Sequence, residues 1–489
     1  MVKDVADLEK VFSPGSARKQ QGCVADNTLI DELDIANIDY SGARTTLSQE
    51  EIKLVRKLDR WIMPTLWVMY WLNYLDRNAI ALARLDDLEQ DLNLEGNEYN
   101  TCISILFVGY LIGQIPSNMY LTRTKPSYYM SFFMALWAIA SGLTALAEDF
   151  KSLLLTRFFL GVLEAPYYPG ALYLLSIFYT RKEIATRISI LYTGNILATA
   201  FAGLIAAGIF AVMDGRSGIK GWQWLFILLG IATFVVALGS AFTLPDDPLN
   251  TRWLTPRERE LAHSRIVSDT VGQRSQTTTW AGLKVAAKDY RLWIFALMQH
   301  LHLAANGFKN FFPTVIQTLG FSRFITLVLT CPPYLIAGVI SVFWSMSSGR
   351  SNERTWHITV AKAVAVVGFV IVCATLNIGA QYAGMVIFTV GTYAVNSIIL
   401  GWVGSTCGQT KEKKSASLAI VNTIANVAFI WTPYIWPSSD KPRYLIAMSS
   451  SIGLSIATAV VAWAMRIILI EKNKKIKRAN DEVVLFYAY

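Results

Sequence analysis

Long apolar segments separated by short polar connections make up most of the chain. A helix rises about 1.5 Å per residue, so about 20 apolar residues cross about 30 Å of hydrocarbon. Twelve segments have this length and character, at about 61–83, 99–121, 127–147, 152–178, 186–212, 222–244, 291–318, 324–346, 356–377, 380–403, 414–437 and 443–470. The pattern predicts an all-α membrane protein with twelve transmembrane helices.

Composition supports the same fold class. Hydrophobic residues make up 53% of the 489 positions and charged residues only 16%, whereas soluble proteins carry about 25% charged residues. The five cysteines are scattered, with no metal-ligand spacing and no disulfide framework. There is no Walker loop and no nucleophile elbow. We therefore expect no enzyme activity, no ATP-driven pump, no metal and no cofactor.

Charge is distributed according to side of the membrane. Basic residues gather in every second connection, at 123–125, 181–187, 350–354 and 411–414, and in the loop 245–290 and the tail after 470. The first intervening connection is instead acidic, from Asp86 to Glu98. This positive-inside pattern predicts that both termini are cytosolic. The net charge of +9 thus follows membrane topology and does not indicate nucleic acid.

The layout predicts five regions. These are a cytosolic tail at 1–56, a six-helix bundle at 57–244, a cytosolic loop at 245–290, a second six-helix bundle at 291–470 and a cytosolic tail at 471–489. The first 56 residues are polar, so we expect no signal peptide there and a mobile tail. An amphipathic piece at 255–268 lies either on the inner membrane surface or in solvent. Transporters built from two such bundles bind their substrate near the midplane between the halves.

Four ionisable residues fall inside predicted spans: Asp76, Arg77, Arg157 and Glu164. A charge at the bilayer centre costs at least about 2.5–3.5 kcal/mol, which makes such residues functional candidates. Helix rise places Asp76, Arg77 and Arg157 at similar depth in the outer half, and Glu164 two turns from Arg157 near the midplane. One reading is a site where Asp76 and Glu164 carry protons while Arg77 and Arg157 attract a carboxylate. The alternatives are a static ion-pair network that closes an external gate, and misplaced interface residues.

A polar stripe follows the seventh span. Gln299, His302, Asn306 and Asn310 are spaced three, four and four residues apart, so they share one helix face. Such a stripe faces a cavity or bonds to a neighbouring helix. We expect His302 and Asn306 to line the cavity, although a neutral packed imidazole is the common alternative. Lys309 is expected at the outer interface, with its ammonium reaching toward water.

Further polar candidates lie in the fourth, tenth and eleventh spans. Asn396, Asn422 and Asn426 bind substrate or join helices to one another. Tyr168 is one of several aromatic residues able to stack on a planar substrate, and packing is the alternative role.

The same residues resemble those of a known family. The resemblance runs from about Leu58 to about Ile470 and rests on Tyr-Leu-Asp-Arg at 74–77, Pro-Ser-Asn at 116–118, Arg-Phe-Phe-Leu-Gly at 157–161, Glu-Ala-Pro-Tyr-Tyr-Pro-Gly at 164–170 and Trp-Gln-Trp-Leu-Phe at 222–226. The chain resembles fungal members of the major facilitator superfamily, in the anion:cation symporter family, close to the allantoate and nicotinate permease branch. The resemblance implies uptake of small organic anions together with protons. It assigns binding and coupling to Asp76, Arg77, Arg157 and Glu164.

Departures from that family concern the substrate. Relatives often continue the aspartate–arginine pair with Ser-Asn-Ile-Gly-Asn, whereas residues 78–82 here read Asn-Ala-Ile-Ala-Leu and lose polar groups. The usual glycine–aspartate–arginine loop after the second span is replaced by residues 120–125. The fifth span lacks the Gly-Pro pattern that resembles drug:proton antiporters, which disfavours export.

The leading expectation is a secondary active transporter that takes up a carboxylate-bearing nutrient or vitamin with protons by alternating access. The proton-coupling residues would be Asp76 and Glu164, and the substrate-binding residues would be Arg77, Arg157, Tyr168, His302, Asn306, Asn396 and Asn422. Two alternatives stay open: an exporter of a fungal secondary metabolite, and a nutrient sensor that does not transport. We expect a monomer in the plasma membrane whose partners are a small organic anion, protons and lipid.

Overall fold

The computed structural model describes residues 48–121, 124–269, 279–407, 411–479 and Tyr487. The chain divides into two compact units, Met1–Gln49 and Glu50–Tyr489, and everything below concerns the second. The expected N-terminal tail lies mostly outside the described residues. Every regular element in the described part is helical, and the all-α fold expected from the apolar segments is confirmed.

Six segments form the first half, and all are helical where the sequence predicts membrane spans. They are α2 (Gln49–Ala83), α4 (Glu98–Leu121), α5 (Pro126–Leu143), α6 (Phe150–Glu164) with α7 (Tyr167–Phe178), α8 (Arg181–Met213) and α9 (Gly221–Thr243). The fourth span is split because the Glu-Ala-Pro sequence interrupts the hydrogen-bond ladder before Tyr167. The break leaves Glu164 at the end of α6.

The second half repeats this layout. It contains α12 (Tyr290–Ala305) with η6 (Asn306–Asn310) and α13 (Phe312–Gln317), α14 (Arg323–Leu329) with α15 (Cys331–Ser351), α16 (Thr355–Ala374), α17 (Ile378–Tyr393) with α18 (Asn396–Thr406), α19 (Lys411–Asn426) with α20 (Ala428–Trp431), and α21 (Leu445–Ala479). The seventh span is therefore not one helix: it narrows to a 3₁₀ turn at Asn306 and resumes at Phe312.

Within the residues that the structure describes, eight of the twelve segments are long and apolar enough to cross a membrane by length and composition. The four outside this set are the first, second, fourth and seventh spans. The first carries Asp76 and Arg77, and the fourth and seventh are broken into shorter helices. Three of the four segments least like ordinary membrane helices thus hold the charges and polar residues of interest.

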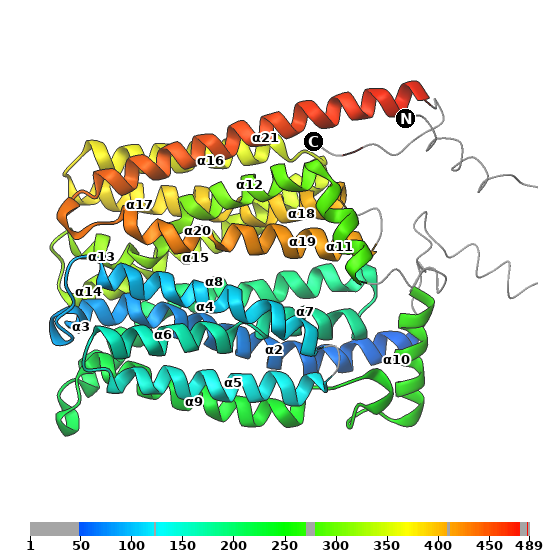
Figure 1. Cartoon of the computed structure of the whole chain (residues 1–489), viewed down its shortest axis with the longest axis horizontal. Helices are drawn as coiled ribbons and strands as arrows, with labels where there is room; N and C mark the ends of the chain where they lie inside the picture. The colour runs from blue at the N-terminus through cyan, green and yellow to red at the C-terminus, as the bar shows by residue number, and fades with distance from the viewer. Residues whose placement is uncertain (1–47, 122–123, 270–278, 408–410, 480–486, 488–489) are drawn as a thin grey trace, which may run out of the picture. The chain divides into compact units, whose positions relative to one another are not determined.

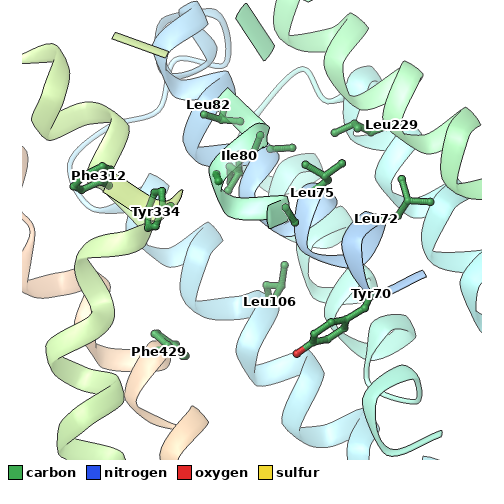
Figure 2. Packing of buried hydrophobic residues seen from close by; sticks show 14 of the residues in the cluster. Tyr70, Leu72, Leu75, Ile80, Leu82, Leu106, Leu229, Phe312, Tyr334 and Phe429 are labelled. Carbon is green, nitrogen blue, oxygen red and sulfur yellow. The ribbon is translucent and has the colours of Figure 1, made fainter. Parts of the chain in front are cut away.

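Glycines allow the helices of the first half to pack closely. A Cβ on Gly161 of α6 would collide with the backbone carbonyl of Leu106 in α4, and one on Gly109 would collide with Phe158. One apolar core extends from these helices into the second half, and Figure 2 shows members from both, such as Leu75 and Phe312. The helices that carry the charges are therefore held by rigid packing.

The polar insert between the halves forms two helices, α10 (Pro256–Asp269) and α11 (Thr279–Lys288). Both lie at one end of the helix bundle, opposite α3 (Leu88–Asp91), as Figure 1 shows. The amphipathic piece expected at the membrane surface or in solvent is ion-paired to α2 through Lys57–Glu258 at 2.7 Å and Arg257–Glu50 at 2.9 Å. The end that carries α10 and α11 is called the α10 end below.

The opposite end, called the η2 end, carries the turn η2 (Arg84–Asp86) and α3. Here the two halves are tied together. Arg323 of α14 forms ion pairs with Asp86 and Asp87, and Thr101 lies 3.1 Å from the hydroxyl of Tyr434. These contacts close the space between the halves at the η2 end.

Candidate functional site

A cavity lies between the two halves and encloses about 930 Å³ including its opening. Its walls combine tyrosines, asparagines and three charged groups. The lining residues that bear on chemistry are Tyr70, Asn73, Tyr74, Arg77, Asn78, Tyr110, Glu164, Tyr168, Tyr192, Asn195, Asn306, Lys309, Tyr393, Asn396, Asn422 and Asn426. Both halves contribute, as a site that changes its access between the two sides of a membrane requires.

One face of α2 supplies five of these residues. They occupy positions 70, 73, 74, 77 and 78, which is the i, i+3, i+4, i+7, i+8 spacing of a single helix face. Asp76 is one position from Arg77 and therefore about 100° away around the axis. Both side chains cannot face the same cavity, and only Arg77 does.

Glu164 and Arg77 form an ion pair across the cavity wall. The Arg77 Nε donates to Glu164 Oε2, and the guanidinium also lies 4.5 Å from the ring centre of Tyr110. The other carboxylate oxygen, Oε1, is buried and has no hydrogen-bond partner among the described residues. Glu164 thus keeps one buried carboxylate oxygen without a described partner.

A second, smaller chamber of about 420 Å³ shares Tyr74, Arg77 and Lys309 with the first. Arg157 lines this chamber, with a fully buried side chain whose three guanidinium nitrogens have no hydrogen-bond partner among the described residues. The described lining contains three basic residues and no acidic one. A buried chamber with this lining attracts anions, because unpaired buried cations are costly and a bound anion offsets that cost.

Lys309 corrects the sequence interpretation. It does not extend to an outer interface: it lines both chambers, with its ammonium 4.1 Å from the ring centre of Phe429. The reason is the break in the seventh span, since η6 turns the chain by about 120° per residue and not the 100° of an α-helix. The signal available in the sequence was Asn306-Gly307, a pair that favours such a break.

Asp76 and His302 do not line either chamber. Asp76 is fully buried inside the first half, where it accepts hydrogen bonds from Ser141 at 2.9 Å and Thr233 at 3.2 Å. His302 is buried inside the second half, close enough to Lys362 for their charges to interact, and neither ring nitrogen has a partner among the described residues. Asp76 is nevertheless close enough to Glu164 and Arg157 for their charges to interact.

The amide and phenol groups predicted for the site do lie on the cavity wall: Tyr168, Asn306, Asn396 and Asn422. Asn396 also donates to the hydroxyl of Tyr192 at 3.1 Å, a contact between the halves. Asn396 therefore both lines the cavity and forms a hydrogen bond between helices, the two roles considered for these amides. The tyrosine-rich wall formed with Tyr70, Tyr110 and Tyr393 was missed, because tyrosines in membrane helices usually mark interfaces.

No group of three or more potential metal ligands occurs in the part of the chain that the structure describes. The groups on the cavity wall can form ion pairs and hydrogen bonds and can stack on aromatic rings, and Glu164 supplies an ionisable carboxyl.

Two bundles of helices around a buried, charged cavity define a multi-pass membrane transporter. The chain belongs to the Major Facilitator Superfamily, whose family model matches residues 66–433. Among curated proteins it is 30% identical to the uncharacterized transporter C1683.12 of Schizosaccharomyces pombe, with 88% of this chain and 89% of that protein covered. It is 29% identical to the major facilitator-type transporter hxnP of Emericella nidulans, with 89% and 90% covered.

Solved structures agree on the fold. A bacterial homolog of the human lysosomal transporter Spinster, in an inward-facing and occupied conformation, matches with a TM-score of 0.67 at 15% identity and covers 84% of this chain and 97% of that one. The xylose transporter XylE of E. coli, in a partially occluded inward-open conformation, matches with a TM-score of 0.62 at 13% identity, covering 83% and 98%. At these identities the likeness concerns the fold alone.

Proposed function

We propose that the protein takes up a small organic anion, a carboxylate nutrient or vitamin, together with protons and by alternating access. The observation that carries this proposal is the smaller chamber, whose lining combines Arg77, Arg157 and Lys309 with no described acidic residue. A carboxylate in this chamber would neutralise the buried guanidinium of Arg157, which has no hydrogen-bond partner among the described residues. The large number of wall hydroxyls and amides gives the uncharged part of the substrate hydrogen-bond partners.

Proton coupling is assigned to Glu164. The residue is buried, pairs with Arg77 and keeps one oxygen without a described partner. When an anion binds to Arg77, it competes with Glu164 for the same cation. Losing that cation favours the neutral form of a buried carboxyl, so anion binding and proton binding support one another. This mutual dependence is what symport requires.

The orientation of the protein in the membrane is inferred from the distribution of basic residues among its connections. The α10 end carries the basic connections, so the positive-inside rule places it in the cytosol and the η2 end outside. With the η2 end closed, the proposal has substrate exchange with the cytosol at the α10 end in this state. We place the protein in the plasma membrane with both termini cytosolic.

Uptake into proteoliposomes tests the proposal. Labelled mono- and dicarboxylates, nicotinate, allantoate and biotin are presented with and without an imposed proton gradient. At least one anion should accumulate when the outside is acidic, and accumulation should stop when the gradient is collapsed. Accumulation that is indifferent to the gradient would refute proton coupling.

Glu164→Gln separates binding from coupling. The variant should still exchange labelled for unlabelled substrate, because the cations remain, but it should no longer accumulate substrate against a gradient. Loss of exchange as well would give Glu164 a structural role and leave the proton site unassigned.

A further inference from the structure

The η2 end contains a buried carboxyl that the transport site does not use. Asp86 ends η2, and its side chain is only 2% exposed. Its partner Arg323 comes from α14 in the other half, is 39% exposed, and is shared with Asp87, whose Nη2–Oδ2 distance is 3.0 Å. The buried carboxylate of Asp86 therefore shares a partly solvent-exposed cation with Asp87.

Of the other groups around Asp86, some favour its protonated form and others favour its ionised form. Asp214, at the end of α8, lies close enough to add its negative charge, and Asp87 adds another. In favour of the ionised form, the start of α9 faces the carboxylate: a Cβ on Gly221 would stand 2.5 Å from Oδ2, and the backbone N–H of Trp222 is directed toward it. Even so, Oδ2 makes no hydrogen bond among the described residues that satisfies normal geometry.

Together, these surroundings stabilise the protonated form of Asp86 more than water stabilises that of an exposed aspartate. Burial raises the pKa of Asp86 to about 6, with Arg323 opposing and Asp214 adding to the shift. If the halves separate at this end, water reaches the carboxyl and its pKa returns toward the ordinary value near 3.9. A proton therefore binds more tightly when the η2 end is closed. By linkage, lowering the pH from about 7 to about 4 favours closure.

We propose that Asp86 is a second proton-binding site, separate from Glu164, and that its proton accompanies closure of the η2 end around Arg323. The inference rests on the proposed function in taking the η2 end as the outer entrance of an alternating-access carrier. When Asp86 is ionised, the positive charge of Arg323 offsets the cost of burying the carboxylate in the closed end. In the protonated form, the closed end needs no ion pair at all. An acidic exterior thus favours closure at the outer side without the proton having to cross the membrane.

The distance between two labels across the η2 end tests this directly and needs no substrate. Spin labels are placed at the exposed residues Glu95 and Gln317, one in each half, in a protein whose five cysteines have been replaced. Distance distributions of the purified protein are recorded from pH 5 to pH 8. The ratio of open to closed molecules should rise with pH and level off above about 6; of the roughly hundredfold change that two units of pKa difference allow, about tenfold falls within this range.

Four variants give opposite expectations for a proton site and a plain ion pair. Asp86→Asn imitates the protonated acid and should stay closed at every pH. Arg323→Gln should open at pH 8, because it leaves a buried carboxylate alone, and should close again in acid. The double variant should stay closed like Asp86→Asn. Asp87→Asn, at an exposed acid that shares the same arginine, is the matched control: it should keep the pH response, with the midpoint moved slightly to lower pH because one neighbouring negative charge is gone.

An Asp86→Asn protein that opens at pH 8 would reduce the contact to a plain ion pair. A pH response that survives in Asp86→Asn would assign the proton to another group. Arg323→Gln that stays closed at pH 8 would also overturn the proposal. Failure of the proposed function looks different: the label distance would respond to pH while no carboxylate is transported.

Discussion

At the scale of single residues, the cavity is defined by positive charge from both halves. Arg77 and Arg157 belong to the first half and Lys309 to the second, and all three line the same chamber. A cation held over an aromatic ring in a dry site keeps part of its attraction for a carboxylate, because few waters compete with the ligand. Under the proposed function, Lys309 would therefore give the second half its own contact with the substrate carboxylate.

Replacing Lys309 should weaken substrate binding more than it weakens folding. Lys309→Gln removes one charge-assisted contact, worth about 1.5–3 kcal/mol, so the apparent KM for the transported anion should rise by about tenfold to a hundredfold. Lys309→Arg keeps the charge and should recover much of the affinity. Uptake at a series of substrate concentrations measures both. An unchanged KM in Lys309→Gln would remove Lys309 from the site.

Lys362 offers the opposite case, a buried cation away from the cavity. Its ammonium has no hydrogen-bond partner among the described residues, and its side chain is 1% exposed. Lys362→Met fills the same space without a polar group, and should raise stability by about 1–3 kcal/mol. Thermal unfolding in detergent measures the change. Lys288→Met, on the exposed end of α11, is the control and should stay within about 0.5 kcal/mol.

The sequence predicted which residue types form the site better than it predicted their directions. Helical spacing can be read from the chain, and it allowed four residues of the cavity wall to be predicted: Arg77, Glu164, Asn306 and Asn422. Lys309 was misplaced because an unbroken helix was assumed across Asn306. Such breaks depend on tertiary contacts as well as on local sequence, so periodicity alone does not locate them.

At the scale of elements, backbone contact between α4 and α6 positions Glu164. The contact depends on Gly161, where an added Cβ meets the carbonyl of Leu106. Apolar segments of the right length predicted all these helices, but not which pairs pack most closely, since that depends on where small residues of two helices coincide. Gly161 sits three residues before Glu164, so any displacement there moves the acid.

Gly161→Ala should destabilise the protein by about 1–3 kcal/mol, because α4 and α6 have to move apart. It should also impair uptake by shifting Glu164 away from Arg77. Gly142→Ala, near the end of α5 with open space around the glycine, should be neutral or slightly stabilising. Thermal unfolding and uptake of both variants give the comparison. Equal effects at the two positions would contradict the packing argument.

The start of α12 is fixed by Asp289, which accepts hydrogen bonds from Arg291 at 2.7 Å and from Lys413 of α19 at 2.7 Å. Burial alone would raise the pKa of Asp289, but these bonds outweigh it and hold the pKa below its usual range. The carboxylate therefore contributes stability that is fully present above about pH 4 and is lost as the pH falls further.

Asp289→Asn should accordingly lower stability by about 1.5–3 kcal/mol at pH 7. The difference from the parent should stay constant between pH 5 and 8 and shrink below pH 4. Thermal unfolding across this range measures it. A difference that grows in acid would reverse the sign of the argument.

At the scale of the whole molecule, the two halves touch closely where α8 meets the junction of α14 and α15. Gly203 of α8 lies against Thr330 and the carbonyl of Leu327, leaving no room for a Cβ. The contact joins opposite halves near the η2 end, so it can form only when that end is closed. The sequence predicted two bundles with a site between them, but gave no means of telling which end is closed.

Gly203→Val should therefore hold the η2 end open and slow transport by at least tenfold while the protein remains folded. Gly208→Val, on the same helix with nothing near the glycine, should transport normally. The label distance between positions 95 and 317 should lengthen only in the first variant. Normal uptake by Gly203→Val would show that the halves do not need this approach.

The cations on opposite halves have a consequence for the carrier when nothing is bound. Arg77 of the first half, although paired with Glu164, repels Lys309 of the second half, and this repulsion grows as the space around them dries. An empty carrier is thereby discouraged from passing through its fully enclosed form, whereas an anion between these cations turns repulsion into attraction. We expect the protein to exchange substrate across the membrane much faster than it returns unloaded, and counterflow compared with net efflux measures the ratio. The preference for crossing with bound substrate would then arise from like charges that are carried by the two halves.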